Sequence, residues 1–262
     1  MKLLFFGDIF GRPGREALKL VLPKLRKIYE PDFVIVNAEN IAHGKGITEK
    51  SLKEILDAGV DAITTGDHAF EQKGSLEIFS QKEMPILRPA NFSNELPGKG
   101  WRLFKVRTKK ILLINLLGRD FIKYKTDDPF HKAKEIIEEN KGETKIVVID
   151  WHTETTSEKR ALAMYLDGEV SAILGTHTHV PTADERILPK GTAYITDVGM
   201  VGPYDSIIGA KADEILKKFL KQLPYALEPA EGKVEADGVF LEIDDKTGLG
   251  KRIERIREIV EI

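Results

Sequence analysis

The chain has 262 residues, of which 42% are hydrophobic and 31% charged, with a formal net charge of −2. It contains no cysteine, which excludes disulfides, thiolate metal sites and a cysteine nucleophile. The near-neutral charge argues against a protein that coats a polyanion, although a local field could hold a small phosphate-bearing substrate. No stretch approaches the roughly 18 apolar residues of a membrane span, and the apolar run before Asp8 is too short for a signal peptide. We therefore predict a cytoplasmic protein.

Short apolar, β-branched runs alternate with longer amphipathic segments along the chain. The apolar runs predict strands at residues 2–6, 33–37, 62–65, 86–89, 103–107, 111–115, 146–149, 172–174, 193–196 and 239–243. The amphipathic segments predict helices at residues 13–29, 48–58, 73–80, 129–139, 157–166 and 210–221. Pro13 suits the first turn of the first helix. Strands and helices alternate early and strands dominate later, which indicates an α/β fold with mixed sheets.

Two further features concern the organisation of the chain. Residues 103–107 and 111–115 predict a hairpin joined by residues 108–110. Residues 251–262 alternate charged side chains with isoleucine and predict either an edge strand or a short helix. We find no internal repeat and no linker long enough to separate domains, so we expect a single domain over residues 1–262.

Polar side chains follow five of the predicted strands at the points where those strands end. In chain order they are Asp8, Glu39 with Asn40, Asp67 with His68, His152, and His177 with His179. Because sites in open α/β sheets form outside the carboxyl ends of strands, we expect these side chains to meet at one edge. Carboxylate, amide and imidazole groups without sulfur are suitable ligands for hard or borderline divalent metals.

The spacing of His177 and His179 bears on the number of metal ions. On an extended strand the two side chains would point the same way, roughly 6.5–7 Å apart. That separation suits two metals about 3.5–4 Å apart, each bound by one imidazole, with the Glu39 carboxylate as a bridge. The pattern therefore predicts a two-metal site.

Each of these residues also has a purely structural interpretation. Asp8 and Asp67 could cap turns, residues 39–40 could begin a polar loop, and His68 could be a surface imidazole. The joint occurrence of the whole set at strand ends is what favours metal binding. Among other residues, His43 could line a substrate loop, and we expect His131 to be solvated and Trp151 to serve packing. For Asn91, Asn115 and Asp197 we expect structural roles, including hydrogen bonds to ligating histidines.

Four short motifs resemble the calcineurin-like metallophosphoesterase superfamily: GD at residues 7–8, GDH at 66–68, DWH at 150–152 and GTHTH at 175–179. The DxH motif usual at the first step is absent, because Phe10 stands where its histidine would be, and Glu39 with Asn40 replace that ligand. This replacement resembles one branch, the YmdB-like bacterial 2′,3′-cyclic nucleotide phosphodiesterases. The longer segments GDIFGRPGR, NAENIAHGKGIT, HTETTSEK, GTHTHVPTAD and TDVGMVGPYDSIIG carry the same resemblance over nearly the whole chain.

The resemblance implies a four-layer α/β/β/α sandwich of two mixed β-sheets and a centre of two divalent metal ions. Iron is the first expectation for the metal, with manganese or zinc as alternatives. The ligand sets implied are Asp8, Glu39, Asn40 and His179 for one metal, and Glu39, Asp67, His152 and His177 for the other. We expect attack on phosphorus by a hydroxide that bridges the metals, with His68 as the general acid for the leaving alkoxide.

One residue departs from the family pattern, which has asparagine where this chain has Asp67. The third carboxylate should tighten metal binding but lower the Lewis acidity of the metal that it contacts. The alternatives to a cyclic-nucleotide phosphodiesterase are a phosphomonoesterase or RNA phosphodiesterase with the same site, and a weakly active metal-binding scaffold or RNA-regulatory module, which Asp67 would favour. The expected partner is a small phosphodiester such as a cyclic nucleotide, with RNA as an alternative. A homo-oligomer is compatible with the sequence, which reveals no interface and no membrane contact.

Overall fold

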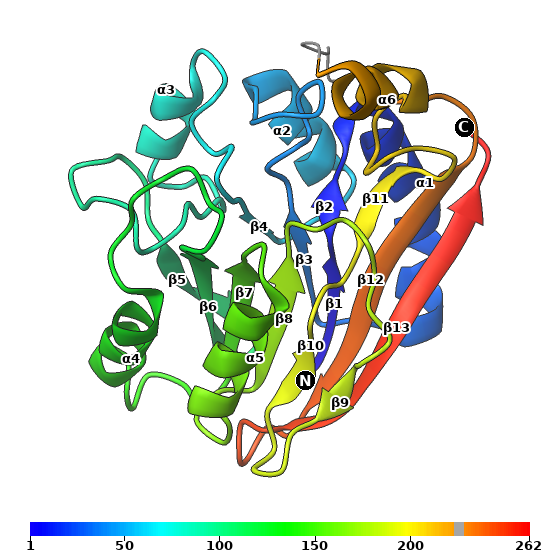
Figure 1. Ribbon diagram of the computed structural model, residues 1–262. Helices are drawn as coiled ribbons and strands as arrows, with labels where there is room; N and C mark the ends of the chain where they lie inside the picture. Colours follow the sequence, from blue (N-terminus) through cyan, green and yellow to red (C-terminus); the bar gives the residue numbers. More distant parts are fainter. Residues whose placement is uncertain (223–227) are drawn as a thin grey trace.

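The computed structural model describes residues 1–222 and 228–262 and contains two mixed β-sheets (Figure 1). The strands of the first sheet run in the order β2-β11-β12-β1-β3-β4, with β13 paired to β12. Their bounds are β1 (Lys2–Phe6), β2 (Asp8–Ile9), β3 (Phe33–Asn37), β4 (Ala62–Thr64), β11 (Met200–Pro203), β12 (Val234–Ile243) and β13 (Gly250–Val260). Strands β1, β3 and β4 are parallel, whereas β12 is antiparallel to β1, β11 and β13.

The second sheet has the strand order β5-β6-β7-β8-β10-β9. Its strands are β5 (Trp101–Val106), β6 (Lys109–Leu117), β7 (Val147–His152), β8 (Ala172–Thr176), β9 (Arg186–Ile187) and β10 (Ala193–Ile195). The inner strands β6, β7, β8 and β10 are parallel, and the outer strands β5 and β9 are antiparallel to their neighbours. All inner strands therefore end on the same side of the molecule.

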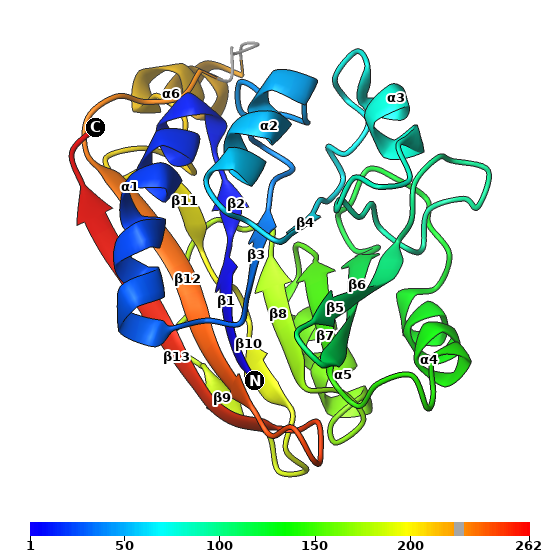
Figure 2. The same cartoon turned by 180° about the vertical axis from the view of Figure 1, so that it is seen from behind.

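Helices cover the outer face of each sheet (Figure 2). Helices α1 (Gly11–Tyr29), α2 (Glu49–Asp57) and α3 (Ser75–Ser80) share a hydrophobic core with the first sheet. Helices α4 (Pro129–Glu139) and α5 (Thr156–Tyr165) share another core with the second sheet. A third core fills the space between the sheets. These layers confirm the predicted four-layer α/β/β/α sandwich of two mixed sheets.

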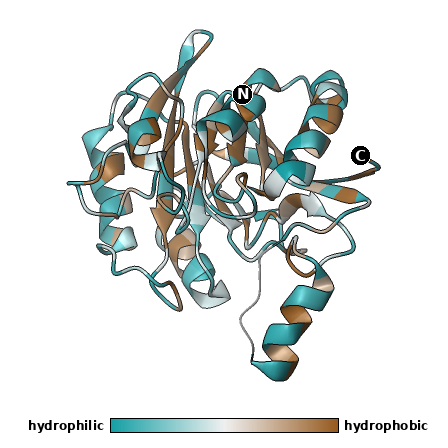
Figure 3. Ribbon diagram, turned by 90° about the horizontal axis from the view of Figure 1, so that it is seen from above, coloured by the Kyte–Doolittle hydropathy of each residue, from teal (hydrophilic) through white to brown (hydrophobic). Residues whose placement is uncertain are grey.

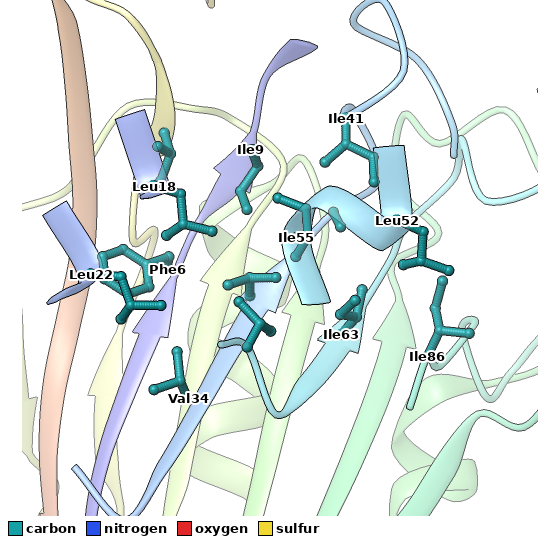
Figure 4. Packing of buried hydrophobic residues seen from close by; sticks show 14 of the residues in the cluster. Phe6, Ile9, Leu18, Leu22, Val34, Ile41, Leu52, Ile55, Ile63 and Ile86 are labelled. Atoms are coloured by element: carbon teal, nitrogen blue, oxygen red, sulfur yellow. The ribbon is translucent and has the colours of Figure 1, made fainter. Parts of the chain in front are cut away.

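The run of apolar residues in strand β1 is continuous because both faces of the strand are covered. Side chains alternate between the two faces of a strand, so Leu4 and Phe6 pack beneath the helices while Leu3 and Phe5 pack between the sheets. All four side chains are fully buried. A strand covered on both faces needs apolar residues at every position. Figure 4 shows the helix-covered side, where Leu18 and Leu22 of α1 lie close to Phe6.

Helix α6 (Ala212–Lys221) differs from the others because it extends away from the sheets (Figure 3). Its buried residue is Ile215, which packs with Phe10 and Ala210. Leu216, Phe219 and Leu220 are exposed. Among the described residues, we find no helix long and apolar enough to cross a bilayer.

Several element predictions were wrong in detail. Residues 86–89 do not form a strand, because Ile86 and Leu87 make only isolated bridges and proline stands at positions 85 and 89. The hairpin turn comprises residues 107–108 rather than 108–110, since Val106 pairs with Lys109. For the C-terminal segment the first of the two alternatives is confirmed, since residues 250–260 form the edge strand β13. The short strands β2, β9 and β11 were not predicted, because such short strands lack a visible period in the sequence.

The buried carboxyl group of Asp237 on β12 provides a test of the fold's electrostatics. Its side chain is 1% exposed, and neither of its oxygens has a hydrogen-bond partner among the described residues, with Arg257 Nε 3.9 Å from Oδ1. Burial, followed by the nearby Glu235, raises the pKa of Asp237 to about 7 from the ordinary 3.8. A folded-state pKa above the unfolded value means that the folded state holds the proton more tightly. The stability contributed by this group is therefore complete below about pH 4 and is lost as the pH rises through about 7.

We expect Asp237→Asn to remove this pH dependence. Relative to the unmodified protein, the variant should gain roughly 1–3 kcal/mol in unfolding free energy between pH 5 and pH 8. Urea unfolding at both pH values measures the difference, with Asp213→Asn, at an exposed position on α6, as the control. A difference between variant and unmodified protein that is the same at both pH values would contradict the assignment.

Candidate metal centre

The seven predicted metal ligands meet where the carboxyl ends of the two sheets lie together. Asp8 begins β2, directly beyond β1, and Glu39 and Asn40 follow β3. The remaining four are Asp67 after β4, His152 at the end of β7, and His177 and His179 after β8. The site is therefore built from both sheets, and not from one sheet edge as the sequence analysis assumed.

One group of four donors is compact. One atom each from Glu39, Asp67, His152 and His177 lies within 4.8 Å of the others. The Nε2 atom of His152 lies 3.1 Å from Glu39 Oε2 and 3.5 Å from Asp67 Oδ1. The Nδ1 atom of His177 lies 3.0 Å from that same Nε2 and 3.6 Å from Asp67 Oδ1. Two carboxylates and two imidazoles thus surround one point.

The other predicted ligands form a second group beside the first. His179 Nε2 lies 3.9 Å from Asp8 Oδ1 and 3.1 Å from the Asn40 side-chain amide. The same amide lies 3.1 Å from Glu39 Oε1, so Glu39 belongs to both groups. The nitrogen and oxygen of an asparagine amide are assigned from its hydrogen bonds, and a half-turn places the oxygen where it can bind a cation.

The donor atoms are suited to a bound cation. Asp8 Oδ1 and Asp67 Oδ1 are buried and have no hydrogen-bond partner among the described residues. Asp8 and Glu39 are 0% and 1% exposed. Buried carboxylates without partners are costly unless a cation balances them. Carboxylate and imidazole donors are also the ligands that borderline divalent ions prefer.

Without a cation, the charges of the cluster act on its own titrating groups. Burial lowers the pKa of His152, but Glu39, Asp67 and Asp8 outweigh burial, so this pKa lies well above its usual range. Burial raises the pKa of Asp67, but the neighbouring His152 outweighs that effect and the pKa is lowered. Burial and then the charge of His152 lower the pKa of His177.

His177 and His179 do not lie on an extended strand, so that part of the prediction was wrong. Their φ angles are 98° and 66°, in the left-handed region that residues other than glycine rarely adopt. Strand β8 ends at Thr176, and the chain then turns through these two residues. As a result His177 lies beside Asp67 in the first group of donors, and His179 lies beside Asp8 in the second group. Such backbone conformations cost about 1–3 kcal/mol each and persist only where the surroundings hold them.

Gly66 allows the donors to come this close. A Cβ atom at this position would lie 2.1 Å from Glu39 Oε2 and 2.2 Å from His152 Nε2. Any side chain would therefore enter the volume in which the ligands converge. The glycine before Asp67 is required by this close approach.

A buried network orients His152 from behind. Its Nδ1 atom lies 2.8 Å from Thr176 Oγ1, and that hydroxyl donates to Asp150 Oδ1 at 2.7 Å. Asp150 also accepts from Asn37 and Thr64. Burial raises the pKa of Asp150 to about 6. Hydrogen bonds of this kind select the ring tautomer, here the one that leaves Nε2 free for a cation.

Sequence reasoning missed this network and one residue at the rim. Glu154 Oε2 lies 3.1 Å from His177 Nε2, which leaves Nδ1 of the same ring for the cluster. The motif HTETTSEK contains Glu154 but gives no sign that it folds back onto His177.

Of the residues expected to support ligands, Asp197 accepts hydrogen bonds from Thr178, between the two histidines. In the described contacts, the side-chain amides of Asn91 and Asn115 donate to backbone oxygens and to one threonine hydroxyl, and not to a predicted ligand. Trp151 is buried and His131 exposed, as predicted.

The comparisons with known proteins identify the family to which the chain is similar. The model of the YmdB-like protein family matches residues 4–256. The chain is 50% identical to the 2′,3′-cyclic-nucleotide 2′-phosphodiesterase of Bacillus subtilis, over 98% of this chain and 96% of that protein. It superposes with a TM-score of 0.93 on the crystal structure of a phosphatase from Mycoplasma pneumoniae, at 41% identity, covering 100% of this chain and 94% of that one.

The chain belongs to the YmdB-like family.

A crystal structure of a hypothetical protein from Thermus thermophilus also resembles this YmdB-like chain, with a TM-score of 0.91 and 40% identity over 100% of this chain and 99% of that one. A 5′-nucleotidase precursor from the same organism shares the fold alone, with a TM-score of 0.60 and 13% identity; the match covers 100% of this chain and 54% of that one.

In this YmdB-like protein a cavity of about 380 Å³ opens over the cluster. Its walls include Gly44, Lys45, His68, Glu154 and Ile208, together with cluster residues. His43 is exposed and does not line this cavity, although its neighbours do. A larger cavity of about 590 Å³, next to Lys141 and Lys145, is lined by none of the predicted ligands. We therefore place the candidate site in the smaller cavity, by its chemistry.

Phe10 has a packing role at the position where the wider superfamily has a histidine. It is 1% exposed, and its ring lies edge-on to His179, with centroids 5.8 Å apart. It also packs with Ala210 and Ile215. In this chain Phe10 thus forms an aromatic wall against His179.

Asp67→Asn tests the charge of the cluster. Replacing the carboxylate by an amide keeps an oxygen donor but removes one negative charge, so we expect Mn²⁺ to bind roughly tenfold more weakly, equivalent to about 1.4 kcal/mol. Titration of the metal-stripped protein with Mn²⁺ measures this. Asp57→Asn, at a carboxylate that is 62% exposed on α2, is the matched control. Equal Mn²⁺ affinity in the variant and the unmodified protein would show that the negative charge of Asp67 does not contribute to metal binding.

Proposed function

We propose that this protein is a metal-dependent phosphodiesterase that hydrolyses 2′,3′-cyclic nucleotides to nucleoside monophosphates. The observation that carries the proposal is the convergence of seven donor side chains from both sheets, four of which line one cavity. Two of their buried carboxylate oxygens lack a hydrogen-bond partner among the described residues. The name of the Bacillus subtilis relative, 50% identical, supports the substrate class and points to cleavage at the 2′ oxygen.

We assign two divalent ions to this centre, with iron as the first candidate and manganese or zinc as alternatives. Asp8, Glu39, Asn40 and His179 would hold one ion, and Glu39, Asp67, His152 and His177 would hold the other. Two such ions supply an acidified water and charge neutralisation at the phosphoryl oxygens. The short distances within each group support this division.

The groups of the chain account for substrate binding and proton transfer. As a water oxygen bonds to phosphorus, the bond from phosphorus to the 2′ oxygen breaks, and His68 gives that oxygen a proton. His68 lines the cavity and its side chain is 22% exposed. Its backbone N–H donates to Glu39 Oε2 at 3.3 Å, which ties it to the cluster. Glu71 Oε1 lies 3.2 Å from His68 Nδ1, although the two atoms are not aligned as a hydrogen bond.

The cavity suits a ligand of nucleotide size that carries a negative charge. Its volume of about 380 Å³ lies within the range of small-molecule sites, roughly 300–1,000 Å³. Lys45 is the lysine on its wall, and its ammonium group, which lies 3.7 Å from Glu71 Oε2, offers a positive charge to a phosphate. Ile208 gives an apolar surface, 47% exposed, against which a base or sugar could pack.

His68→Ala tests the general acid. We expect turnover on a 2′,3′-cyclic nucleotide to fall by roughly 10²–10⁴-fold, because the leaving oxygen loses its proton donor. Metal content should stay unchanged, since His68 is not among the ligands. His131→Ala, at an imidazole that is 88% exposed, is the control. Loss of bound metal in the His68 variant would instead assign this residue to the metal centre.

Metal removal and a substrate series test the function itself. Chelation should abolish hydrolysis, and Fe²⁺, Mn²⁺ or Zn²⁺ should restore it. Rates on 2′,3′-cyclic AMP, p-nitrophenyl phosphate and a short RNA should be highest on the cyclic nucleotide. A preference for the monoester or the RNA would favour the two alternative hydrolases. Metal binding without turnover on any of the three would favour a scaffold or an RNA-regulatory module.

Two remaining expectations stay proposals. We infer a homo-oligomer, supported by the exposed Leu216, Phe219 and Leu220 on the projecting helix α6, and light scattering of the purified protein measures it. We infer a cytoplasmic location from the sequence, and fractionation of cells expressing the full chain measures it.

A further inference from the structure

A fully buried lysine lies directly behind the loop that carries the two histidines. Lys159 is on α5, and its side chain is 1% exposed. Its ammonium group donates to the backbone oxygen of Thr176 at 2.9 Å and to Asp197 Oδ2 at 2.6 Å. Lysine is almost never fully buried unless it is paired, so the pair with Asp197 is the feature to explain.

Asp197 extends the same contact to the middle of the loop. It is 0% exposed, and its Oδ2 atom accepts from the backbone N–H of Thr178 at 3.1 Å and from the Thr178 hydroxyl at 2.7 Å. The ion pair therefore holds the residue before His177 and the residue between His177 and His179. Both histidines have positive φ angles, a conformation that requires such external support.

A third ligand is connected to the same pair through the backbone. Asp197 Oδ1 accepts from the N–H of Gly199 at 2.8 Å. The carbonyl of Gly199 in turn accepts from the N–H of Asp8 at 3.2 Å. Gly199 has a φ of 94°, which a glycine adopts without strain. One buried ion pair thus links Asp8, His177 and His179, which come from different sheets.

We propose that Lys159 and Asp197 are positioning residues for the metal centre. Neither belongs to the donor cluster; they fix the backbone from which Asp8, His177 and His179 present their ligand atoms. The inference rests on the proposed metal centre and adds to it the part of the chain that determines its geometry. A buried ion pair contributes little net stability compared with apolar residues of similar size, so stability alone does not account for it.

The double variant Lys159→Met/Asp197→Asn separates the two roles, because it removes both charges and leaves no unpaired buried ion. We expect its affinity for Mn²⁺ to fall about 10–100-fold, as found when groups that orient metal ligands are removed. The measurement is a Mn²⁺ titration of the metal-stripped full chain, followed by the electron paramagnetic resonance signal of the free ion. Urea unfolding of the same metal-free samples records stability.

Leu162→Ala is the matched control, because Leu162 is buried on the same helix but packs in the core beyond the second sheet. It should lower stability and leave Mn²⁺ affinity unchanged. Thr178→Val removes one donor to Asp197 without changing the buried charges, and we expect a smaller loss of affinity, about 3–10-fold. This variant decides the question if the double variant does not fold.

The outcomes separate this inference from the metal centre itself. If the unmodified protein binds no Mn²⁺, both proposals are overturned. If it binds Mn²⁺ and the folded double variant binds it within twofold of the same affinity, only the positioning role is overturned. If the double variant does not fold, unchanged affinity in Thr178→Val overturns the positioning role in the same way.

Discussion

The burial of several carboxylates at one point is the constraint on which the rest of the structure depends. Asp8 and Glu39 are almost fully enclosed, Asp67 is nearly so, and two of their oxygens have no hydrogen-bond partner in the part of the chain that the structure describes. Such an arrangement is unfavourable in an interior of low dielectric constant unless cations or protons balance it. In the metal-free cluster His152 supplies part of that balance, which is why its pKa is raised.

The two-sheet architecture provides the rigidity that holds these groups together. The core between the sheets contains Leu3 and Phe5 from one side and Leu113 and Val148 from the other. It fixes the distance between strand ends that belong to different sheets. Because packed interiors resist deformation, the predicted ligands beyond the ends of β1, β3 and β4 keep their positions relative to those at the ends of β7 and β8. The chemistry therefore lies in loops, whereas its precision comes from the layers beneath them.

Charged and polar residues outside the ligand set have distinct tasks around this centre. The hydrogen bonds that connect His152 through Thr176 to Asp150 select the tautomer of His152. Glu154 does the same for His177 from the solvent side. Lys159 and Asp197 act on the backbone and not on the imidazoles. The cluster is thus supported on three sides, by a buried carboxyl group, a rim carboxylate and a buried ion pair. Phe10 completes the enclosure with an apolar wall.

The family resemblance implied the two covered sheets. The sequence by itself determined the alternation of strands and helices and the identity of the residues that gather at the site. Those properties follow from local periodicity and from polar residues placed at strand ends, both of which are readable along the chain. Only the tertiary structure decided that two sheets share the site, that His177 lies near Asp67 while His179 lies near Asp8, that Glu154 folds back onto His177, and that Lys159 is buried behind the histidine loop. These features depend on contacts between residues far apart in sequence and on backbone angles that the surrounding packing imposes. A buried lysine and an exposed one look the same in a sequence, because the difference lies in what folds over them.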